Sequence, residues 1–177
     1  MTRALFAVVL PVALLFSSAH AVDLRSGDPA PRFTARTHGG GEFRLEDRKG
    51  HWTVLYFYPK AGTPGCTRQA DAFRDGIAAI RAQGASVFGI STDTIESQAA
   101  FHEEEHLPFT LLADPEGAVT RAYGAKMPIL TMSRRWTFII DPTLTIRQVE
   151  HDVDPAEDAP RVAVEIARLK GDVGAQP

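Results

Sequence analysis

The chain has 177 residues, of which 44% are hydrophobic and 23% are charged, and its formal net charge is −3. This balance excludes a disordered or fibrous protein, and the charge offers no basic face for a nucleic acid or an anionic membrane surface. A single cysteine, Cys66, excludes an internal disulfide, a CxxC redox pair and a four-cysteine zinc site.

The first 21 residues have the pattern of an export signal. Arg3 supplies a positive charge, an apolar run follows over Ala4–Phe16, and Ala19–Ala21 forms a small-residue cleavage site. We therefore expect a signal peptide over residues 1–21, no membrane association after its removal, and one domain over residues 22–177. In a bacterium this domain would be exported to the periplasm, an oxidising compartment in which a lone thiol is exposed to disulfide formation.

The rest of the chain alternates strand-like and helix-like segments. The expected elements are a hairpin over 33–44, a buried strand over 52–58, a helix from about 63 to 80, a strand over 86–90, a helix over 94–105, a strand over 109–112, a short helix or turn over 115–123, two strands over 136–140 and 144–149, and a helix over 155–169. The turn Asp141-Pro142-Thr143 indicates that the last two strands pair antiparallel. This order predicts a three-layer α/β sandwich with a mixed central sheet and an N-terminal hairpin.

The helix after the buried strand places Cys66 in a chemically distinctive position. Thr63 suits the N-cap, Pro64 suits the first helical position, and apolar residues recur from Cys66 to Ile80 at intervals of three and four. Cys66 should therefore lie in the first turn, on the inward face, where backbone N–H groups and the helix dipole favour a thiolate. The Thr63 hydroxyl can donate to this thiolate or to an oxygen that it attacks. The segment suits nucleophilic attack on an electrophile that loses an oxyanion.

The segment YFYPKAGTPGCTRQADAFRD, and within it Pro59-x-x-x-Thr63-x-x-Cys66, resembles the active site of peroxiredoxins. The flanking residues resemble the Q-type, or bacterioferritin comigratory, subfamily, and the resemblance continues through FHEEEHLPFTLLAD and Arg135–Phe138. It covers most of the chain after residue 21. The resemblance implies a thioredoxin-like fold and a thiol-dependent peroxidase that needs no metal or organic cofactor.

The resemblance also implies a role for four residues. Cys66 would be the peroxidatic cysteine, and Pro59 would shield its pocket. Thr63 would hydrogen-bond the thiolate and the peroxide, and Arg135 would hold both with its guanidinium; the neighbouring Arg134 is the less favoured candidate. Attack on the O–O bond of hydrogen peroxide or an organic hydroperoxide would give a sulfenic acid and release water or an alcohol.

Two positions depart from the family pattern. Many Q-type members have a resolving cysteine five residues after the peroxidatic one, where this chain has Asp71. The sulfenic acid would therefore be reduced by an external thiol, namely a thioredoxin-like or glutaredoxin-like protein, glutathione, or Cys66 of a second molecule. Gln69 stands where members often have Glu, which removes a negative charge near the thiolate. The sequence leaves a monomer or a homodimer open, and the apolar stretch Met127–Met132 suggests either a preference for alkyl hydroperoxides or a dimer contact.

Two other classes of function stay open. A thioredoxin-like redox-sensing or binding protein would oxidise Cys66 without efficient peroxidase turnover. The segment His102–His106 satisfies H-E-x-x-H, which taken literally predicts a zinc metallohydrolase. Pro108 should end the helix just after this segment, and Phe109 stands where the metzincin continuation needs Gly. We therefore expect a solvated acidic helix face there.

Overall fold

The structure, a computed structural model, describes residues 23–174 of the chain. The export signal expected over residues 1–21 lies outside the described residues. Within residues 23–174, none of the helices combines the length and the apolar character needed to cross a bilayer.

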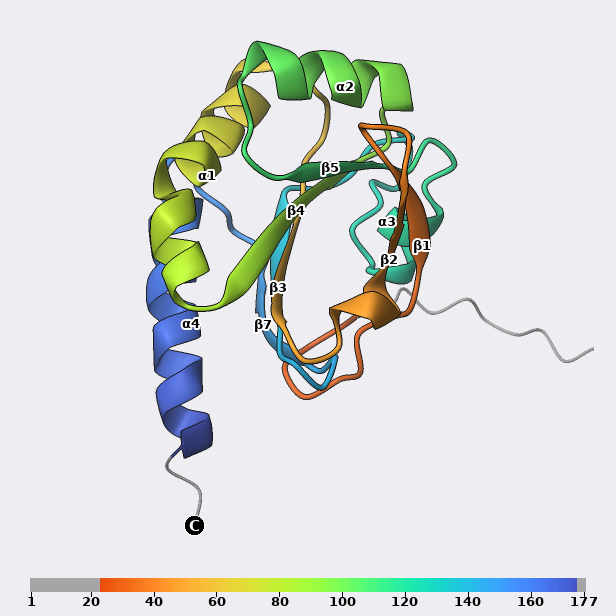
Figure 1. Ribbon diagram of the computed structural model, residues 1–177. Coiled ribbons are helices and arrows are strands. Elements are labelled where there is room, and N and C mark those ends of the chain that lie inside the picture. Colours follow the sequence, from red (N-terminus) through yellow and green to blue (C-terminus); the bar gives the residue numbers. More distant parts are fainter. Residues whose placement is uncertain (1–22, 175–177) are drawn as a thin grey trace, which may run out of the picture.

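One mixed sheet of seven strands, in the order β2-β1-β5-β4-β3-β6-β7, forms the centre of the described fold (Figure 1). Strands β3, β4 and β5 are parallel to one another, whereas β1, β2, β6 and β7 pair antiparallel with their neighbours. This arrangement confirms the predicted mixed sheet and the N-terminal hairpin. The strands are β1 (Thr34–Thr37), β2 (Glu42–Arg44), β3 (Trp52–Phe57), β4 (Ala85–Ser91), β5 (Thr110–Ala113), β6 (Trp136–Ile140) and β7 (Ile146–Glu150).

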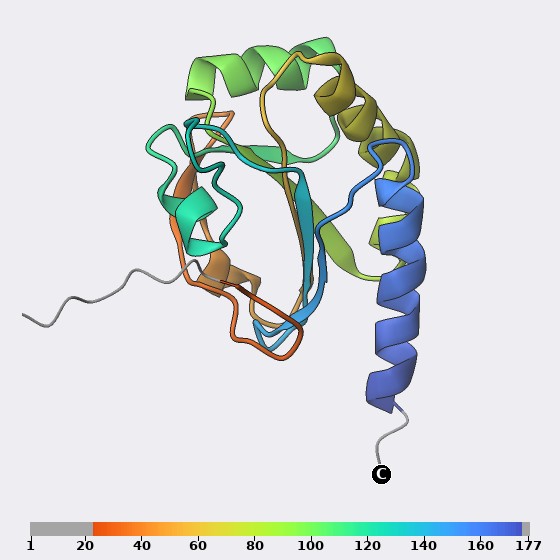
Figure 2. The ribbon, with the colours of Figure 1, turned by 180° about the vertical axis from the view of Figure 1, so that it is seen from behind.

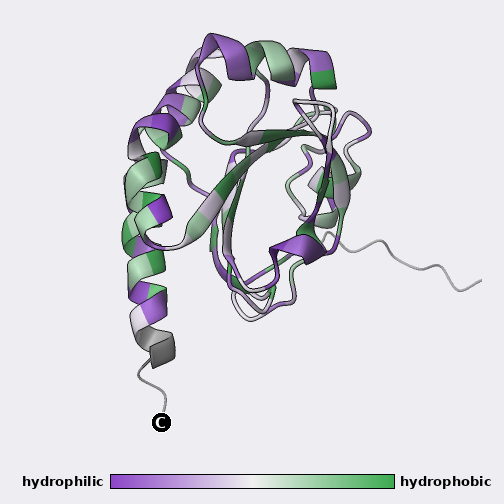
Figure 3. Cartoon of the chain, in the orientation of Figure 1, coloured by the Kyte–Doolittle hydropathy of each residue, from purple (hydrophilic) through white to green (hydrophobic). Residues whose placement is uncertain are grey.

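Helices cover both faces of the sheet. Helices α1 (Pro64–Ala82) and α4 (Asp158–Gly174) pack against each other on one face, and α3 (Ala118–Ala122) lies on the other (Figures 1 and 2). Helix α2 (Ile95–Glu104) lies near β5. Hydrophobic and hydrophilic residues alternate along α1 and α4, as expected for helices that bury one side (Figure 3). The three layers predicted from the sequence are therefore present.

Strand β3, which lies between β4 and β6 inside the sheet, contributes to both clusters of the core. All six of its residues are buried, as expected for a strand covered on both faces. Val54 and Tyr56 point toward α1 and α4 and pack with Phe73, whereas Leu55 and Phe57 belong to the cluster on the face of α3. This two-sided burial fixes the register of β3, because a slip of one residue would exchange the two sets.

The structure differs from the predicted elements mainly at their ends. The last strand begins at Ile146 rather than at residue 144, because Leu144 has a positive φ of 65° and its N–H donates to Asp141 O within the turn. The final helix begins at Asp158 rather than at residue 155. A short 3-10 helix over Leu45–Arg48 was not predicted.

The geometry of His102–His106 rules out the metallohydrolase interpretation. Helix α2 ends at Glu104, and His106 follows with a positive φ of 51°, so His102 and His106 do not share a helix face. Instead, the His102 ring stacks on the ring of His38, with 3.7 Å between centroids. Among the described residues, no three His, Cys, Asp or Glu side chains come together as a metal site would require.

The stacked histidines should make stability depend on pH. Burial lowers the pKa of His38, and burial together with the facing His38 lowers the pKa of His102. The unfolded chain then binds more protons than the folded chain below about pH 6.5, so the free energy of unfolding should decrease as the pH falls through that value. We expect His102→Gln to weaken this dependence in urea unfolding at about pH 5.5 and pH 7.5. His51→Gln, at an exposed position, is the control and should keep the pH dependence of the parent protein. If the free energy of unfolding changes equally between the two pH values in both variants, the account is contradicted.

Candidate functional site

The site lies where the parallel strands end. The loops after β3 and β4 meet at this edge of the sheet, and α1 begins there at Pro64. Strand β6 runs antiparallel to β3 with Trp136 opposite Phe57, so Arg135, directly before β6, reaches the same edge. Two segments 69 residues apart in the chain thereby come into contact.

Cys66 is the third residue of α1 and is 1% exposed. Its N–H donates to Thr63 O at 2.9 Å, and Thr63 occupies the N-cap with an extended backbone. The thiol is free and points to the inward side of the helix. The predicted position of Cys66, in the first turn and facing inward, is therefore confirmed, and the positive end of the helix dipole lies beside its sulfur.

Arg135 makes the direct polar contact with the sulfur. Its Nη2 donates to Cys66 Sγ at 3.5 Å, and its Nη1 donates to Gln69 Oε1 at 2.6 Å. The planar guanidinium thus joins two residues one turn apart on α1. The neighbouring Arg134 does not take part, because its guanidinium lies over the Trp136 ring, 5.3 Å from the centroid. The structure therefore brings Arg135, and not Arg134, to Cys66.

Thr63 and Pro59 lie in the segment that leads into α1. The Thr63 hydroxyl donates to Lys60 O at 2.9 Å and makes no capping hydrogen bond to α1. The backbone position predicted for Thr63 is right, but the predicted side-chain contact with the thiol is not formed. A hydroxyl has one proton, so donation to the sulfur or to a bound oxygen requires it to leave Lys60 O. Pro59 is half-buried in the loop directly after β3.

Three residues at and after the end of β4 hold the segment before α1 in place. Ala61 N–H donates to Asp93 Oδ2 at 2.8 Å, and the Ser91 hydroxyl donates to the same oxygen at 2.7 Å. The Tyr58 hydroxyl donates to Gln98 Oε1, and burial raises the pKa of Tyr58. Sequence reasoning missed Ser91, Asp93 and Gln98, although the polar run from Ser91 to Thr94, directly after the strand expected over 86–90, is a signal that could have drawn attention to the first two.

The arrangement can stabilise a thiolate and a developing oxyanion at one place. The guanidinium of Arg135 and the N-terminal end of α1 are both positive, and both lie next to the sulfur. No second thiol exists in the sequence to form a disulfide. Asp71, five residues after Cys66, pairs instead with Arg74 at 2.6 Å. The site is that of a cysteine nucleophile that depends on another molecule for any disulfide step.

The chain is similar to proteins of known family. The sequence profile described as the AhpC/TSA family matches residues 26–149. A protein named peroxiredoxin bcp from Coxiella burnetii is 37% identical over 126 residues, which cover 68% of this chain and 83% of that protein. Several chloroplastic peroxiredoxin Q proteins are longer, and the chain spans 57% of their length.

Solved structures show the same similarity. The peroxidoxin BcpB of Mycobacterium tuberculosis superposes with a TM-score of 0.78 at 31% identity, and the match covers 82% of this chain and 98% of that one. The bacterioferritin comigratory protein of Xanthomonas campestris, studied for alkyl peroxide reduction, superposes with a TM-score of 0.73 at 27% identity. That match covers 77% of this chain and 90% of the other.

Gly65 offers a test of the contact between Arg135 and the sulfur. A Cβ at Gly65 would lie 3.2 Å from Arg135 Nη2, so Gly65→Ala should push the guanidinium away from Cys66. We expect the pH midpoint of thiolate formation to rise while the melting temperature does not fall, because Ala favours a helix over Gly by about 1 kcal/mol. The thiolate is measured by its ultraviolet absorbance, which reports Cys66 alone once the Cys66→Ser spectrum is subtracted.

Gly171→Ala is the control for this change. A Cβ at Gly171 in α4 meets nothing within 4 Å, so this variant makes the same substitution in a helix without a contact near Arg135. Its thiolate midpoint should equal that of the parent protein. An unchanged midpoint in Gly65→Ala would show that Arg135 does not stabilise the Cys66 thiolate.

Proposed function

Because the chain belongs to the AhpC/TSA family, we propose that its site works as a one-cysteine thiol peroxidase of the Q type. The observation that carries this proposal is the contact of Arg135 Nη2 with Cys66 Sγ at the N-terminal end of α1. A positive group and a helix terminus at one sulfur favour the thiolate, and they can also stabilise the oxygen that leaves when the peroxide bond breaks. The substrates are hydrogen peroxide and organic hydroperoxides.

The first half-reaction uses residues of this chain. The Cys66 thiolate attacks one peroxide oxygen, the S–O bond forms as the O–O bond breaks, and the sulfur becomes a sulfenic acid. The other oxygen leaves as hydroxide or alkoxide and takes a proton to give water or an alcohol. Arg135 holds the thiolate and the peroxide, and Thr63 donates to them after its hydroxyl leaves Lys60 O. Pro59, half-buried before α1, shields the sulfenic acid from bulk water.

The second half-reaction needs an external thiol. Its sulfur attacks the sulfenic sulfur, which releases water and leaves a mixed disulfide, and a second thiol then frees Cys66. The reductant is a thioredoxin-like or glutaredoxin-like protein or glutathione, or a second copy of the chain forms a transient disulfide through its own Cys66. The support for this step is the single cysteine and the ion pair that Asp71 makes with Arg74.

An apolar loop beside the site favours organic hydroperoxides. Met127 N–H donates to Met132 O, which closes a loop whose tip exposes Ile129 and Leu130. The Thr92 hydroxyl donates to Thr131 O and so ties this loop to the segment after β4. Because the same segment holds the loop before α1, and because the apolar loop leads into Arg135, we infer that the apolar tip forms part of the rim of the site. The alkyl peroxide reduction described for the Xanthomonas campestris protein supports this substrate class.

Export is part of the proposal. The charged start, apolar run and small-residue site over residues 1–21 are typical of a cleavable signal peptide. The mature protein would begin at Val22 and act outside the cytoplasm, in the periplasm of a bacterium. An oxidising compartment would expose the sulfenic acid to disulfide-exchange proteins, which fits a peroxidase without a resolving cysteine.

Turnover of peroxide by the mature chain tests the proposal. We expect consumption of hydrogen peroxide and cumene hydroperoxide in the presence of a thioredoxin system, a glutaredoxin system or glutathione, and its complete loss in Cys66→Ser. Chelation with EDTA should have no effect, because the step needs no metal. Slow, stoichiometric oxidation of Cys66 with every reductant would instead favour a redox sensor or binding protein.

Removal of the apolar tip tests the substrate preference. We expect the double variant Ile129→Ser, Leu130→Ser to lower the ratio of the rate constants for cumene hydroperoxide and hydrogen peroxide severalfold, because the alkyl group loses an apolar contact. Val164→Ser is the control, since Val164 is an exposed apolar residue on α4. If the ratio is unchanged and the mass in solution falls from dimer to monomer, the loop is a dimer contact and not a substrate rim.

A further inference from the structure

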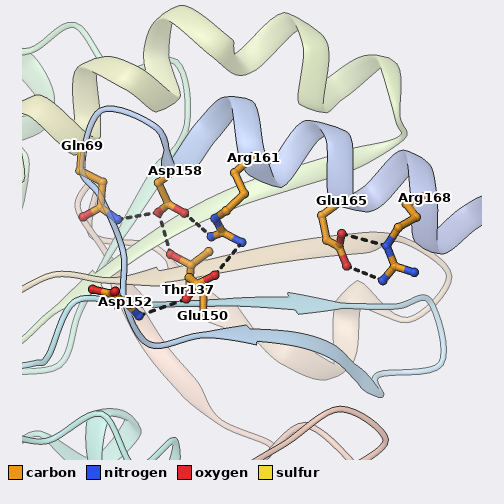
Figure 4. A network of polar contacts seen from close by, with 8 residues as sticks. All are labelled: Gln69, Thr137, Glu150, Asp152, Asp158, Arg161, Glu165 and Arg168. Carbon is orange, nitrogen blue, oxygen red and sulfur yellow. Dashed lines mark hydrogen bonds and ion pairs between the residues drawn. The ribbon is translucent and has the colours of Figure 1, made fainter.

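The side chain of Gln69 connects the site to the start of α4. Gln69 is fully buried, and its Nε2 donates to Asp158 Oδ2 at 2.7 Å (Figure 4). Its Oε1 accepts the hydrogen bond from Arg135 Nη1 at 2.6 Å. The amide therefore lies between a carboxylate of α4 and the guanidinium that contacts Cys66 Sγ.

The carboxylate of Asp158 is held by donors from three elements. Besides Gln69 of α1, the Thr137 hydroxyl of β6 donates to Oδ2 at 2.7 Å. Arg161, one turn along α4, donates from Nη2 to Asp158 Oδ1 at 2.5 Å, and its Nη1 lies 3.6 Å from Glu150 Oε2 (Figure 4). The Asp158 side chain is 0% exposed. A buried carboxylate with this set of donors has one defined position.

The Asp158 carboxylate determines the orientation of the Gln69 side-chain amide. An ionised carboxylate only accepts hydrogen bonds and a guanidinium only donates them, whereas an amide does both at opposite ends. With Asp158 on one side, Gln69 must turn its NH2 toward α4 and its oxygen toward Arg135. A reversed amide would set its oxygen against the carboxylate and its NH2 against the guanidinium.

We propose that Asp158 is a positioning residue for the peroxidase site, which through the Gln69 amide holds the Arg135 guanidinium against Cys66 Sγ. This inference rests on the proposed function, because it is the reaction of Cys66 with peroxide that Arg135 serves. It also gives a reason for the glutamine at position 69. A glutamate there would face the buried Asp158 carboxylate at hydrogen-bond distance, and two like charges in such a place repel.

Two effects of removing the Asp158 charge have opposite signs. Loss of a nearby negative charge by itself would favour the thiolate and lower the pH midpoint of its formation. Loss of the amide orientation would free Arg135 from the sulfur, disfavour the thiolate and raise the midpoint. The sign of the change therefore separates the positioning role from a simple field effect.

The first experiment compares Asp158→Asn with Glu165→Gln, each in the full mature chain. Glu165 pairs with Arg168 on the same helix, so this control also removes a carboxylate from an ion pair of α4 (Figure 4). We expect Asp158→Asn to raise the thiolate midpoint and to lower the rate constant with hydrogen peroxide about tenfold, the loss typical of a charge-assisted hydrogen bond. Glu165→Gln should change neither quantity.

The second experiment exchanges the amide of Gln69 and the carboxylate of Asp158 between the two positions. Gln69→Glu alone should react slowly with hydrogen peroxide, because two carboxylates then face each other. The double variant Gln69→Glu, Asp158→Asn restores one carboxylate and one amide, with an acceptor still facing Arg135. We expect it to recover most of the parental rate constant, and unfolding by urea shows for each variant that the measured protein is folded.

The outcomes separate this inference from the proposed function. If the parent protein reacts no faster with hydrogen peroxide than free cysteine does, the proposed function fails. If the parent reacts fast but Asp158→Asn matches Glu165→Gln in midpoint and rate, the positioning role is wrong. A lowered midpoint in folded Asp158→Asn, or a double variant no faster than Gln69→Glu, also overturns it.

Discussion

The hydrogen bond from Arg135 to the sulfur of Cys66 is the interaction on which the site depends. It joins residues 69 positions apart, and the fold makes it possible through one register, in which Trp136 of β6 lies opposite Phe57 of β3. A shift of either strand by one residue would exchange its two buried faces and would move Arg135 away from the start of α1. The core packing that fixes the register of β3 therefore also fixes the position of the Arg135 guanidinium beside the Cys66 thiol.

Around this contact, the fold leaves space for the Arg135 guanidinium and provides an acceptor for its second nitrogen. Gly65 has no side chain where Arg135 Nη2 passes, and Gln69 accepts the other arm of the guanidinium. The start of α4 contributes Asp158, so both helices on one face of the sheet meet at the same side chain. The site is thus built from the first turn of α1, the residue before β6 and the first residue of α4, and only the first of these carries the nucleophile.

Local sequence patterns predict the fold and the nucleophile, and the family resemblance adds the contact of Arg135 with Cys66, but neither predicts the other contacts that orient the site. The run of β-branched and aromatic residues in β3, and the recurrence of apolar residues after Cys66, predict a buried strand and a helix with an inward thiol, as the structure confirms. The Thr63 hydroxyl, however, donates to Lys60 O, a choice among nearby acceptors that spacing does not determine. The pairing of Gln69 with Asp158 joins residues 89 positions apart, and no short motif reports such a contact. Likewise, the H-E-x-x-H pattern that begins at His102 does not form the continuous helix that a zinc site of this type needs, because α2 ends before His106.

The most direct test of the account is the reaction of the reduced mature protein with hydrogen peroxide in a single turnover. Stopped-flow tryptophan fluorescence follows the reaction, since Trp136 lies next to Arg135, and mass spectrometry of the trapped product locates the oxidised atom. The account predicts a rate constant far above that of free cysteine, one sulfenic acid on Cys66, and a large decrease in rate in Arg135→Gln. A rate constant equal to that of free cysteine, or one that Arg135→Gln leaves unchanged, would contradict it.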